Sequence, residues 1–357
     1  MEKETKIIEM LDRNSFIPLY VQLKNLLKEK IINNKFSYNA PIPSEKSLCK
    51  KYNISQITVR LALKDLENEG LIVRIPGKGT FIKKNTTIQI ENTIGLIPPH
   101  ISKGSSFFLS ELIIGIKEKL REHNLVILEY QEIFKNMKKN LKGIILTEPK
   151  INDERIKFLK EKNIPFVVLG KPSEIENINV PYVDNNNLEI GEILTEHLIK
   201  LRRKRIGIIL GPADLTVCVD RLEGYKNALK NNGIPFDEDL TYYGEFSEKT
   251  GFKGGQILYG RGTDGIVCCD DLIAIGCLKY LKQKKVKVPD EISVVGCNNS
   301  IFTTYIEPPL TTVEIFPRKL GFWACDKLLK LIQNGKIKDK AKIIKGKLII
   351  RESSVKK

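Results

Sequence analysis

The 357-residue sequence has few of the residues, and none of the motifs, on which most enzymatic and metal sites depend. Its three histidines, His100, His123 and His197, are far apart and form no HExxH motif, so a metal site or a histidine base is not expected. No GxSxG, Walker A or GxGxxG motif follows an apolar run. Asp270 and Asp271 are adjacent and therefore do not converge on one atom. We expect no catalysis, cofactor or metal.

Long apolar runs are also absent. No segment approaches the roughly 18 consecutive apolar residues that a membrane span needs, and residues 1–6 precede no apolar stretch typical of a secretory signal. The seven cysteines are odd in number and form no CxxC pair, which favours reduced thiols and a cytoplasmic protein. Cys268 and Cys269 end an apolar run, and we interpret them as buried thiols rather than a redox pair.

Positive charge is abundant and unevenly distributed. Lys and Arg outnumber Asp and Glu by 59 to 43, and the net charge is +16. Residues 1–84 hold 16 basic and 9 acidic residues, a net charge of +7, so this segment is the more basic per residue. Such a balance favours a polyanion as partner. The polar residues 85–92 lack periodicity and predict a linker between domains at 1–84 and 93–357.

The N-terminal domain shows signals for three helices and a hairpin. One helix starts at Pro18, and Ser44 and Ser55 are candidate N-caps of two more. Apolar residues at helical spacing line the third helix, which ends at Gly70. This stripe consists of Val59, Ala62, Leu63 and Leu66.

Two β segments, 71–74 and 80–82, enclose a glycine-rich turn. Three helices and this hairpin predict a winged helix-turn-helix, an α+β fold whose third helix enters a DNA major groove. A small helical module that docks proteins is the alternative.

Four motifs in this domain strengthen the DNA-binding interpretation: PSEKSL at 43–48, SQITVR at 55–60, LKDLENEGL at 63–71 and PGKGTF at 76–81. Together they resemble the GntR family of bacterial regulators. The resemblance implies that the DNA contacts come from Lys46, Ser55, Gln56, Thr58, Arg60, Gly77 and Lys78. The family most often has a basic residue at the position of Gln56, and an amide there favours adenine over guanine.

From residue 93 onward, apolar β segments alternate with helical segments, which predicts parallel sheets covered by helices. We predict strands at 93–97, 125–128, 143–146, 166–169, 205–210, 265–268 and 292–295, and helices at 110–122, 188–201, 221–231 and 272–283. This number of strands favours a two-lobed α/β domain. Its ligand would bind at the carboxyl ends of the strands, in the cleft between the lobes.

A second resemblance covers most of 93–355. VDN at 183–185, DRLEGY at 220–225, DDLIA at 270–274, VPDEISVVG at 288–296 and PPLTTV at 308–313 are similar to the LacI/GalR-type domain. That domain has the two-lobed fold of periplasmic sugar-binding proteins. The whole chain is most similar to the arabinose-responsive repressors of Gram-positive bacteria. The resemblance implies a homodimer that binds double-stranded operator DNA and is released by a small effector, with an arabinose-like pentose favoured.

The same resemblance implies effector contacts from Phe107 and Phe108, just before the first helix, and from Arg221, Asp270 and Asn298. Each contact has a structural alternative: an ion pair of Arg221 with a neighbouring glutamate, an N-cap at Asp270, and core or interface packing of the phenylalanines.

Three features depart from the family pattern. The connection at 131–141 is short, Arg202-Arg203 replace the usual Gly-His, and Asn298 replaces an Asp. Other functions therefore stay open. The chain could be a regulator with a non-sugar effector, an activator, or a carbohydrate-binding module without a regulatory role.

Overall fold

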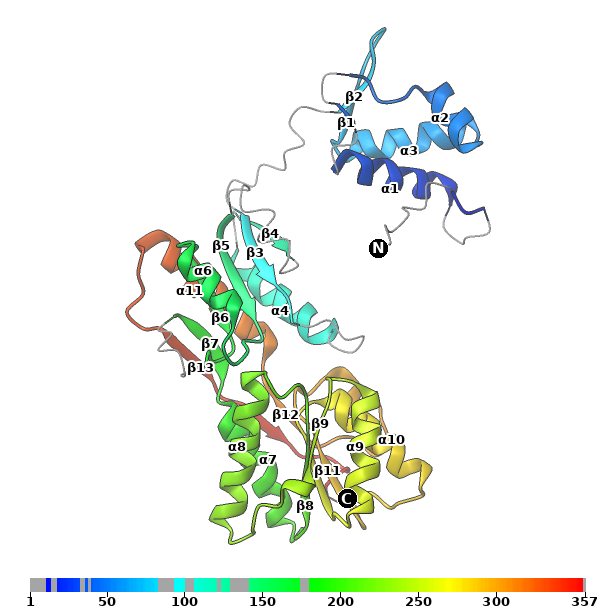
Figure 1. The fold of residues 1–357 in the computed structure, drawn as a ribbon. Helices are drawn as coiled ribbons and strands as arrows, with labels where there is room; N and C mark the ends of the chain where they lie inside the picture. The colour runs from blue at the N-terminus through cyan, green and yellow to red at the C-terminus, as the bar shows by residue number, and fades with distance from the viewer. Residues whose placement is uncertain are drawn as a thin grey trace, which may run out of the picture. The chain divides into compact units, whose positions relative to one another are not determined.

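The computed structural model describes residues 11–13, 18–32, 36–37, 40–82, 93–99, 106–120, 123–128, 141–173 and 180–355. Contacts between Cα atoms divide the chain into two compact units, residues 1–90 and 91–357, which we call the head and the body (Figure 1). The predicted linker at 85–92 and the short connection before Leu141 lie outside the described residues.

The head contains three helices and one hairpin, at α1 (Leu19–Ile32), α2 (Glu45–Tyr52), α3 (Gln56–Asn68), β1 (Ile72–Ile75) and β2 (Gly79–Ile82). Both predicted N-caps are confirmed. The Ser44 side chain accepts a hydrogen bond from the Ser47 backbone N–H at 3.2 Å, and Ser55 accepts one from that of Thr58 at 3.2 Å. These caps fix where α2 and α3 begin, because each satisfies a donor that the helix leaves free.

The predicted stripe of α3, from Val59 to Leu66, forms the centre of the head's core, and its four side chains are at most 1% exposed. Gly70 ends the helix at a φ of 70°. Its N–H donates to the Glu67 carbonyl, and the Leu71 N–H donates to that of Leu66. This double pattern is a Schellman motif. It turns the chain directly into the antiparallel β1–β2 hairpin.

The first lobe of the body is built on a six-stranded sheet in the order β13-β7-β6-β5-β3-β4, whose described pairings are all parallel. Its helices are α4, α6 and α11, and α4 and α11 pack against each other (Figure 1). The elements are β3 (Thr93–Ile97), α4 (Ser106–Lys119), β4 (Asn124–Ile127), β5 (Leu141–Thr147), α6 (Glu154–Glu161), β6 (Phe166–Leu169), β7 (Tyr182–Asn185), α11 (Pro317–Asn334) and β13 (Ala341–Ile344).

The second lobe has a four-stranded parallel sheet in the order β11-β10-β8-β9. Helices pack as the pairs α7–α8 and α9–α10. The elements are α7 (Asn187–Lys200), β8 (Ile206–Leu210), α8 (Thr216–Asn231), η2 (Glu238–Leu240), β9 (Thr241–Tyr243), α9 (Glu248–Gly260), β10 (Gly265–Cys268), α10 (Asp271–Gln283), β11 (Ser293–Val295) and η3 (Ile301–Thr304). A small antiparallel pair, β12 (Thr312–Glu314) and β14 (Lys347–Ile349), completes the body.

The chain crosses between the lobes three times, at 185–187, 314–317 and 344–347. One buried side chain connects all three crossings. The Asn185 Nδ2 donates to the carbonyl oxygen of Ile315 at 3.1 Å and to that of Ile344 at 2.7 Å. The three crossings therefore form one hydrogen-bonded hinge.

The two-lobed α/β fold is as predicted, but several element boundaries differ. Helix α4 starts at Ser106, so Phe107 and Phe108 lie inside the helix and not before it. Helix α8 starts at Thr216, which places Arg221 in the second turn and not at the helix start. The N-cap of α8 is Leu215, which makes no side-chain capping bond. This start therefore had no polar signal in the sequence.

Helices α6, α9 and α11 and strands β7, β9 and β12 to β14 are additional to the predicted elements. Within the described parts of the chain, no helix is long and apolar enough to cross a membrane.

Candidate nucleic-acid interface and ligand pocket

The seven residues predicted to contact DNA occupy three places in the head. Lys46 lies on α2, four lie at the start of α3, and Gly77 and Lys78 lie at the turn of the hairpin. All are exposed except Thr58. The Thr58 hydroxyl lies 2.8 Å from that of Ser55, so these two side chains hydrogen-bond to each other at the N-terminus of α3. Backbone N–H groups at such a terminus favour an anion such as a phosphate.

Glu45 on α2 positions two of these side chains. Its Oε2 accepts hydrogen bonds from Arg60 Nε at 2.9 Å and from Gln56 Nε2 at 3.2 Å. Arg74 Nη1 of β1 lies 3.4 Å from the other carboxylate oxygen. Burial opposes ionisation of Glu45, but the hydrogen bonds from Arg60 and Gln56 outweigh it and lower its pKa. An ionised Glu45 therefore links α2, α3 and the hairpin.

The tip of the hairpin is a tight turn that requires glycine. Gly77 has a φ of 72° and Gly79 a φ of 116°, values that L side chains rarely adopt. The Lys78 N–H donates to the Ile75 carbonyl at 3.0 Å and closes the turn. The exposed Lys78 side chain is therefore carried at the tip between two residues without side chains, which allows the backbone to approach a groove closely.

Two exposed apolar residues of α3 are not among the residues predicted to contact DNA. Ile57 is 72% exposed and Leu61 is 45% exposed, although both are large hydrophobic residues. They lie one helical turn apart on the face opposite the buried stripe. The sequence does contain a signal for the exposure of these two residues, because positions outside the buried stripe of an amphipathic helix face solvent.

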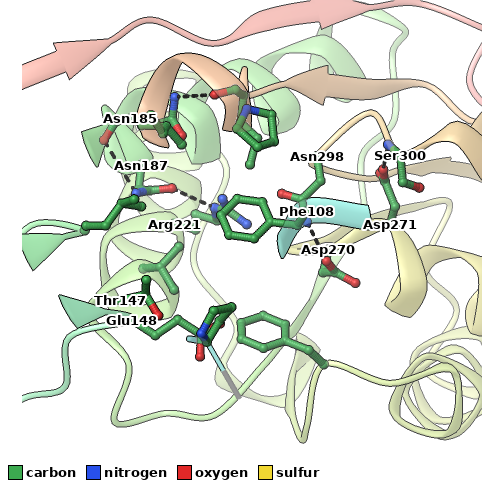
Figure 2. A pocket seen from close by; sticks show the side chains of 18 of the residues that line it. Phe108, Thr147, Glu148, Asn185, Asn187, Arg221, Asp270, Asp271, Asn298 and Ser300 are labelled. Atoms are coloured by element: carbon green, nitrogen blue, oxygen red, sulfur yellow. Dashed lines mark hydrogen bonds between the residues drawn. The ribbon is translucent and has the colours of Figure 1, made fainter. Parts of the chain in front are cut away.

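In the body, a cavity of about 150 Å³ opens between the two lobes (Figure 2). It lies at the carboxyl ends of β5, β6 and β7 of the first lobe and of β8, β10 and β11 of the second. This is where parallel α/β sheets bind ligands. All five predicted effector contacts line it: Phe107, Phe108, Arg221, Asp270 and Asn298.

Arg221 is the central cation of the pocket and is only 6% exposed. Its Nε donates to Asn187 Oδ1 at 3.0 Å (Figure 2). Its Nη1 donates to the Cys269 carbonyl. The alternative ion pair with Glu223 does not form. Nη2 makes no hydrogen bond to a described residue and is not enclosed by protein. Arg221 therefore offers free N–H donors to a ligand.

Asn187 joins Arg221 to the first lobe. Its Nδ2 donates to Asp184 Oδ1 at 3.0 Å, so the path Asp184–Asn187–Arg221 spans the first crossing between lobes. Complete burial raises the pKa of Asp184 to about 7. The sequence analysis missed Asp184 and Asn187 as pocket residues, although VDN at 183–185 was noted as a motif.

Asp270 and Asn298 form a second polar pair in the pocket. Asp270 is the N-cap of α10, because its Oδ1 accepts the N–H of Leu272 at 2.7 Å. Its other oxygen, Oδ2, accepts a hydrogen bond from Asn298 Nδ2 at 2.6 Å (Figure 2). An aspartate at 298 would place two carboxylates in contact, whereas Asn298 supplies the missing donor. Asn298 itself holds an unusual φ of 115°.

A third carboxyl group, Asp271, is buried beside this pair. It accepts hydrogen bonds from Thr312 Oγ1 at 2.6 Å and from the Ser300 N–H at 2.7 Å. Burial, followed by repulsion from Asp270, raises the pKa of Asp271 to about 8. Near neutral pH, Asp184 and Asp271 are thus partly protonated.

Aromatic rings supply the apolar part of the wall. Phe107 and Phe108 come from α4, Phe246 comes from a loop of the second lobe, and Phe302 comes from η3. Phe108 packs against the hydrophobic clusters of both lobes. Rings beside hydrogen-bonding groups suit a ligand with apolar C–H faces and polar edges.

A direct contact, which we call the inter-lobe bridge, links residues 149–151 to residues 214–216. The Ile151 N–H donates to the Asp214 carbonyl at 2.8 Å, and the Thr216 N–H donates to the Pro149 carbonyl at 3.1 Å. Lys150 Nζ lies 2.7 Å from Asp214 Oδ2. The lobes are therefore hydrogen-bonded both at the hinge and at this bridge, and the structure describes a closed arrangement.

The described residues contain no group of His, Cys, Asp and Glu side chains that is suited to a metal ion. The seven cysteines are free, and Cys268 and Cys269 are buried as predicted. His197 is hydrogen-bonded to Ser354 Oγ at 2.8 Å, away from the pocket.

Comparisons with known proteins agree with both units. Residues 19–82 match the family of bacterial regulatory proteins of the gntR type, and residues 195–354 match a periplasmic binding protein-like domain. The arabinose metabolism transcriptional repressor of Geobacillus stearothermophilus is 28% identical over 95% of this chain and 98% of its own.

Two solved structures extend these matches. A structure described as transcriptional regulator LacI from Bacillus cereus subsp. cytotoxis NVH 391-98 is 31% identical and has a TM-score of 0.70. The match covers 74% of this chain and 98% of the chain in that structure. A complex of the transcriptional regulator CelR with cellobiose has a TM-score of 0.70 at 23% identity and covers 91% of this chain and 94% of its own, which shows the same fold.

Proposed function

The chain belongs to the GntR/LacI-type sugar-responsive transcriptional regulators, and we propose that it is a non-enzymatic cytoplasmic repressor. It acts as a homodimer that binds operator DNA through its heads. It releases the DNA when a neutral monosaccharide, with an arabinose-like pentose favoured, fills the pocket of the body.

The observation that carries this proposal is the unsatisfied guanidinium of Arg221 in a closed pocket. A buried cation is costly unless it is paired, and among the described residues Arg221 donates hydrogen bonds to neutral acceptors only. Ligand hydroxyl groups would complete its hydrogen bonding. The pocket sets three carboxyl groups, Asp184, Asp270 and Asp271, beside one arginine. It therefore lacks the excess of positive charge that would favour an anion, and a neutral polyhydroxyl compound fits best.

The lining of the pocket favours a small ligand. Its space of about 150 Å³ is bordered by polar groups and phenylalanine rings from both lobes, which suits one sugar ring that is polar at its edge and apolar on its faces. Together with the similarity to an arabinose metabolism repressor, this places a pentose first among the candidates.

The hinge and the inter-lobe bridge suggest how binding reaches the DNA. A ligand held by Arg221 of one lobe and Phe108 of the other binds more tightly to the closed than to the open body. It therefore shifts the population toward the closed state. In a dimer, this shift changes the spacing of the two heads, which must match two half-sites.

A homodimer is part of the proposal because a twofold protein reads a palindromic site. The surface on and directly after η3 supports it. Ile301, Phe302 and Tyr305 are 49%, 51% and 81% exposed there, an unusual set of apolar side chains for a free surface. Sedimentation of the full chain should give the mass of a dimer.

Thermal-shift measurements with pentoses, hexoses, uronic acids and nucleosides test the effector. We expect a neutral pentose to raise the melting temperature and to release a selected operator duplex. If only uronic acids or nucleosides stabilise the protein, the proposed effector class is wrong. If no sequence is enriched from random DNA, the proposed repressor function fails.

Arg221→Lys should abolish the thermal shift and leave operator affinity unchanged, because a lysine cannot supply the planar fork of donors. Arg203→Lys is the matched control. Arg203 also donates from the second lobe, to Ser293 Oγ at 3.0 Å and to the Pro289 carbonyl, but it does not line the pocket. It should lose stability without losing the effector response.

A further inference from the structure

The outward face of α3 combines two cations with an apolar ridge. Ile57, Arg60, Leu61 and Lys64 lie at helical spacing on this face and are all exposed. Ile57, the second residue of the helix, is 72% exposed, more than any other large hydrophobic residue in the described part of the head.

Packing and helix stability do not explain this isoleucine. The core of the head is formed on the opposite face, by the stripe from Val59 to Leu66, and it does not include Ile57. A β-branched residue is also a weaker helix former than the alanine, glutamate or lysine that suits an exposed position. An isoleucine at this position therefore lowers both solubility and helix propensity, which indicates a binding role.

The chemistry of the major groove offers one apolar partner. Among the groups that base pairs present there, hydrogen-bond donors and acceptors dominate, and the thymine 5-methyl group is the apolar exception. In a helix-turn-helix, the first residues of the recognition helix reach the base edges. Ile57 lies between Gln56 and Thr58 and is thus placed to reach a base.

We propose that Ile57 is a specificity-determining residue that packs against the methyl group of a thymine in each operator half-site. This inference rests on the proposed function of the head. It adds an apolar contact to the polar contacts expected from Gln56 and Arg60. It also specifies a thymine near the adenine that an amide at 56 favours.

The test uses the full chain and an operator duplex selected from random DNA by the wild-type protein. Each thymine of the half-site is replaced in turn by deoxyuridine, which removes only the methyl group. Binding is measured by fluorescence anisotropy at one salt concentration. At one thymine per half-site, we expect affinity to fall by about fourfold, the value for one buried methyl group.

Ile57→Ala should bind the thymine and uracil duplexes equally. Its melting temperature should equal or slightly exceed that of the wild type, because Ile57 is not part of the core and alanine is the better helix former. Leu61→Ala, on the same face but one turn further along, is the matched control and should keep the preference for thymine.

The proposal is overturned if no uracil substitution weakens binding, or if Ile57→Ala retains the methyl preference. A change in oligomeric mass of Ile57→Ala without a change in methyl preference would identify a protein contact instead and also overturns it. Failure to select any operator would contradict the proposed function itself, so the two failures are distinguishable.

Discussion

Arg60 Nε donates to Glu45 Oε2 at 2.9 Å, so a residue predicted to contact DNA is held by a carboxylate on the neighbouring helix. We expect this carboxylate to lie on the surface that approaches phosphates. It would then weaken general attraction to DNA while it fixes the direction of one arginine. Such a contact would favour accurate recognition of sequence over affinity.

Glu45→Gln should separate these two effects. We expect tighter binding to random DNA, because a negative charge is removed, and a specificity ratio lower by about tenfold, because a guided Arg60–base contact provides roughly 1–3 kcal/mol of discrimination. Titrations of selected and scrambled duplexes over a range of salt concentrations measure the affinity for random DNA and the specificity ratio. Glu67→Gln is the control, since Glu67 forms an ion pair with no described residue other than Arg74, at 3.6 Å. An unchanged specificity ratio in Glu45→Gln would show that Glu45 does not guide Arg60.

Asn185→Asp should destabilise the body strongly. An ionised carboxylate cannot donate to the carbonyl oxygens of Ile315 and Ile344, and two buried acceptors would lose their partner. We expect a loss of roughly 3 kcal/mol in the free energy of unfolding, measured by urea denaturation.

Asn124→Asp is the matched control, because Asn124 is exposed at the start of β4 and its side chain makes no hydrogen bond to a described residue. Equal stability of the two variants would mean that the hinge does not depend on the Asn185 amide.

Gly191→Ala should impair the effector response from outside the pocket. A methyl group at Gly191 of α7 would lie 2.2 Å from the Arg221 carbonyl oxygen of α8. The helices must then separate, at a cost of roughly 1–3 kcal/mol, and Arg221 moves with its helix. We expect at least a tenfold weaker effector affinity by calorimetry.

Gly260→Ala, where a methyl group would meet no atom within 4 Å, should leave affinity and stability unchanged. An effector affinity that is intact in Gly191→Ala would contradict the need for close packing of α7 and α8.

Stability should depend on pH through Asp271. Its pKa is raised by burial from 3.8 to about 8, so folding favours the protonated form. The stabilisation is complete below about pH 4 and is lost as pH rises to about 8.

The difference in unfolding free energy between the wild type and Asp271→Asn should therefore fall across this window, at most by about 1.4 kcal/mol per pH unit. Urea denaturation at each pH tests this. Asp239→Asn, at a side chain that is 79% exposed, is the control. A constant difference between the wild type and Asp271→Asn would show that Asp271 is ionised throughout.

Local signals explain how much could be predicted. Ser44, Ser55 and Gly70 mark helix ends in the sequence itself, and the stripe of α3 follows helical spacing, so the head was predicted almost completely. The five pocket residues Phe107, Phe108, Arg221, Asp270 and Asn298 were placed by family resemblance and do line one cavity.

Long-range contacts explain what was missed. The bonds from Asn185 to Ile315 and Ile344 join residues more than a hundred positions apart, which no local pattern reveals. Helix α8 begins without a capping side chain, so its first turn was not recognised. Ile57 could not be predicted from the usual polar signals of a DNA contact, because its side chain is apolar.

Because the chain crosses between the lobes three times, a ribosome must synthesise almost the whole chain before either lobe is complete. Among the described residues, the core of the head contains none beyond Ile82. The first lobe needs the strand at 341–344, and the second needs Ser353, whose carbonyl accepts the Val294 N–H at 2.9 Å. At roughly 5–20 residues per second, the head can fold some ten to fifty seconds before either lobe. During that interval the nascent polypeptide carries a finished DNA-binding unit with no means of sensing its effector.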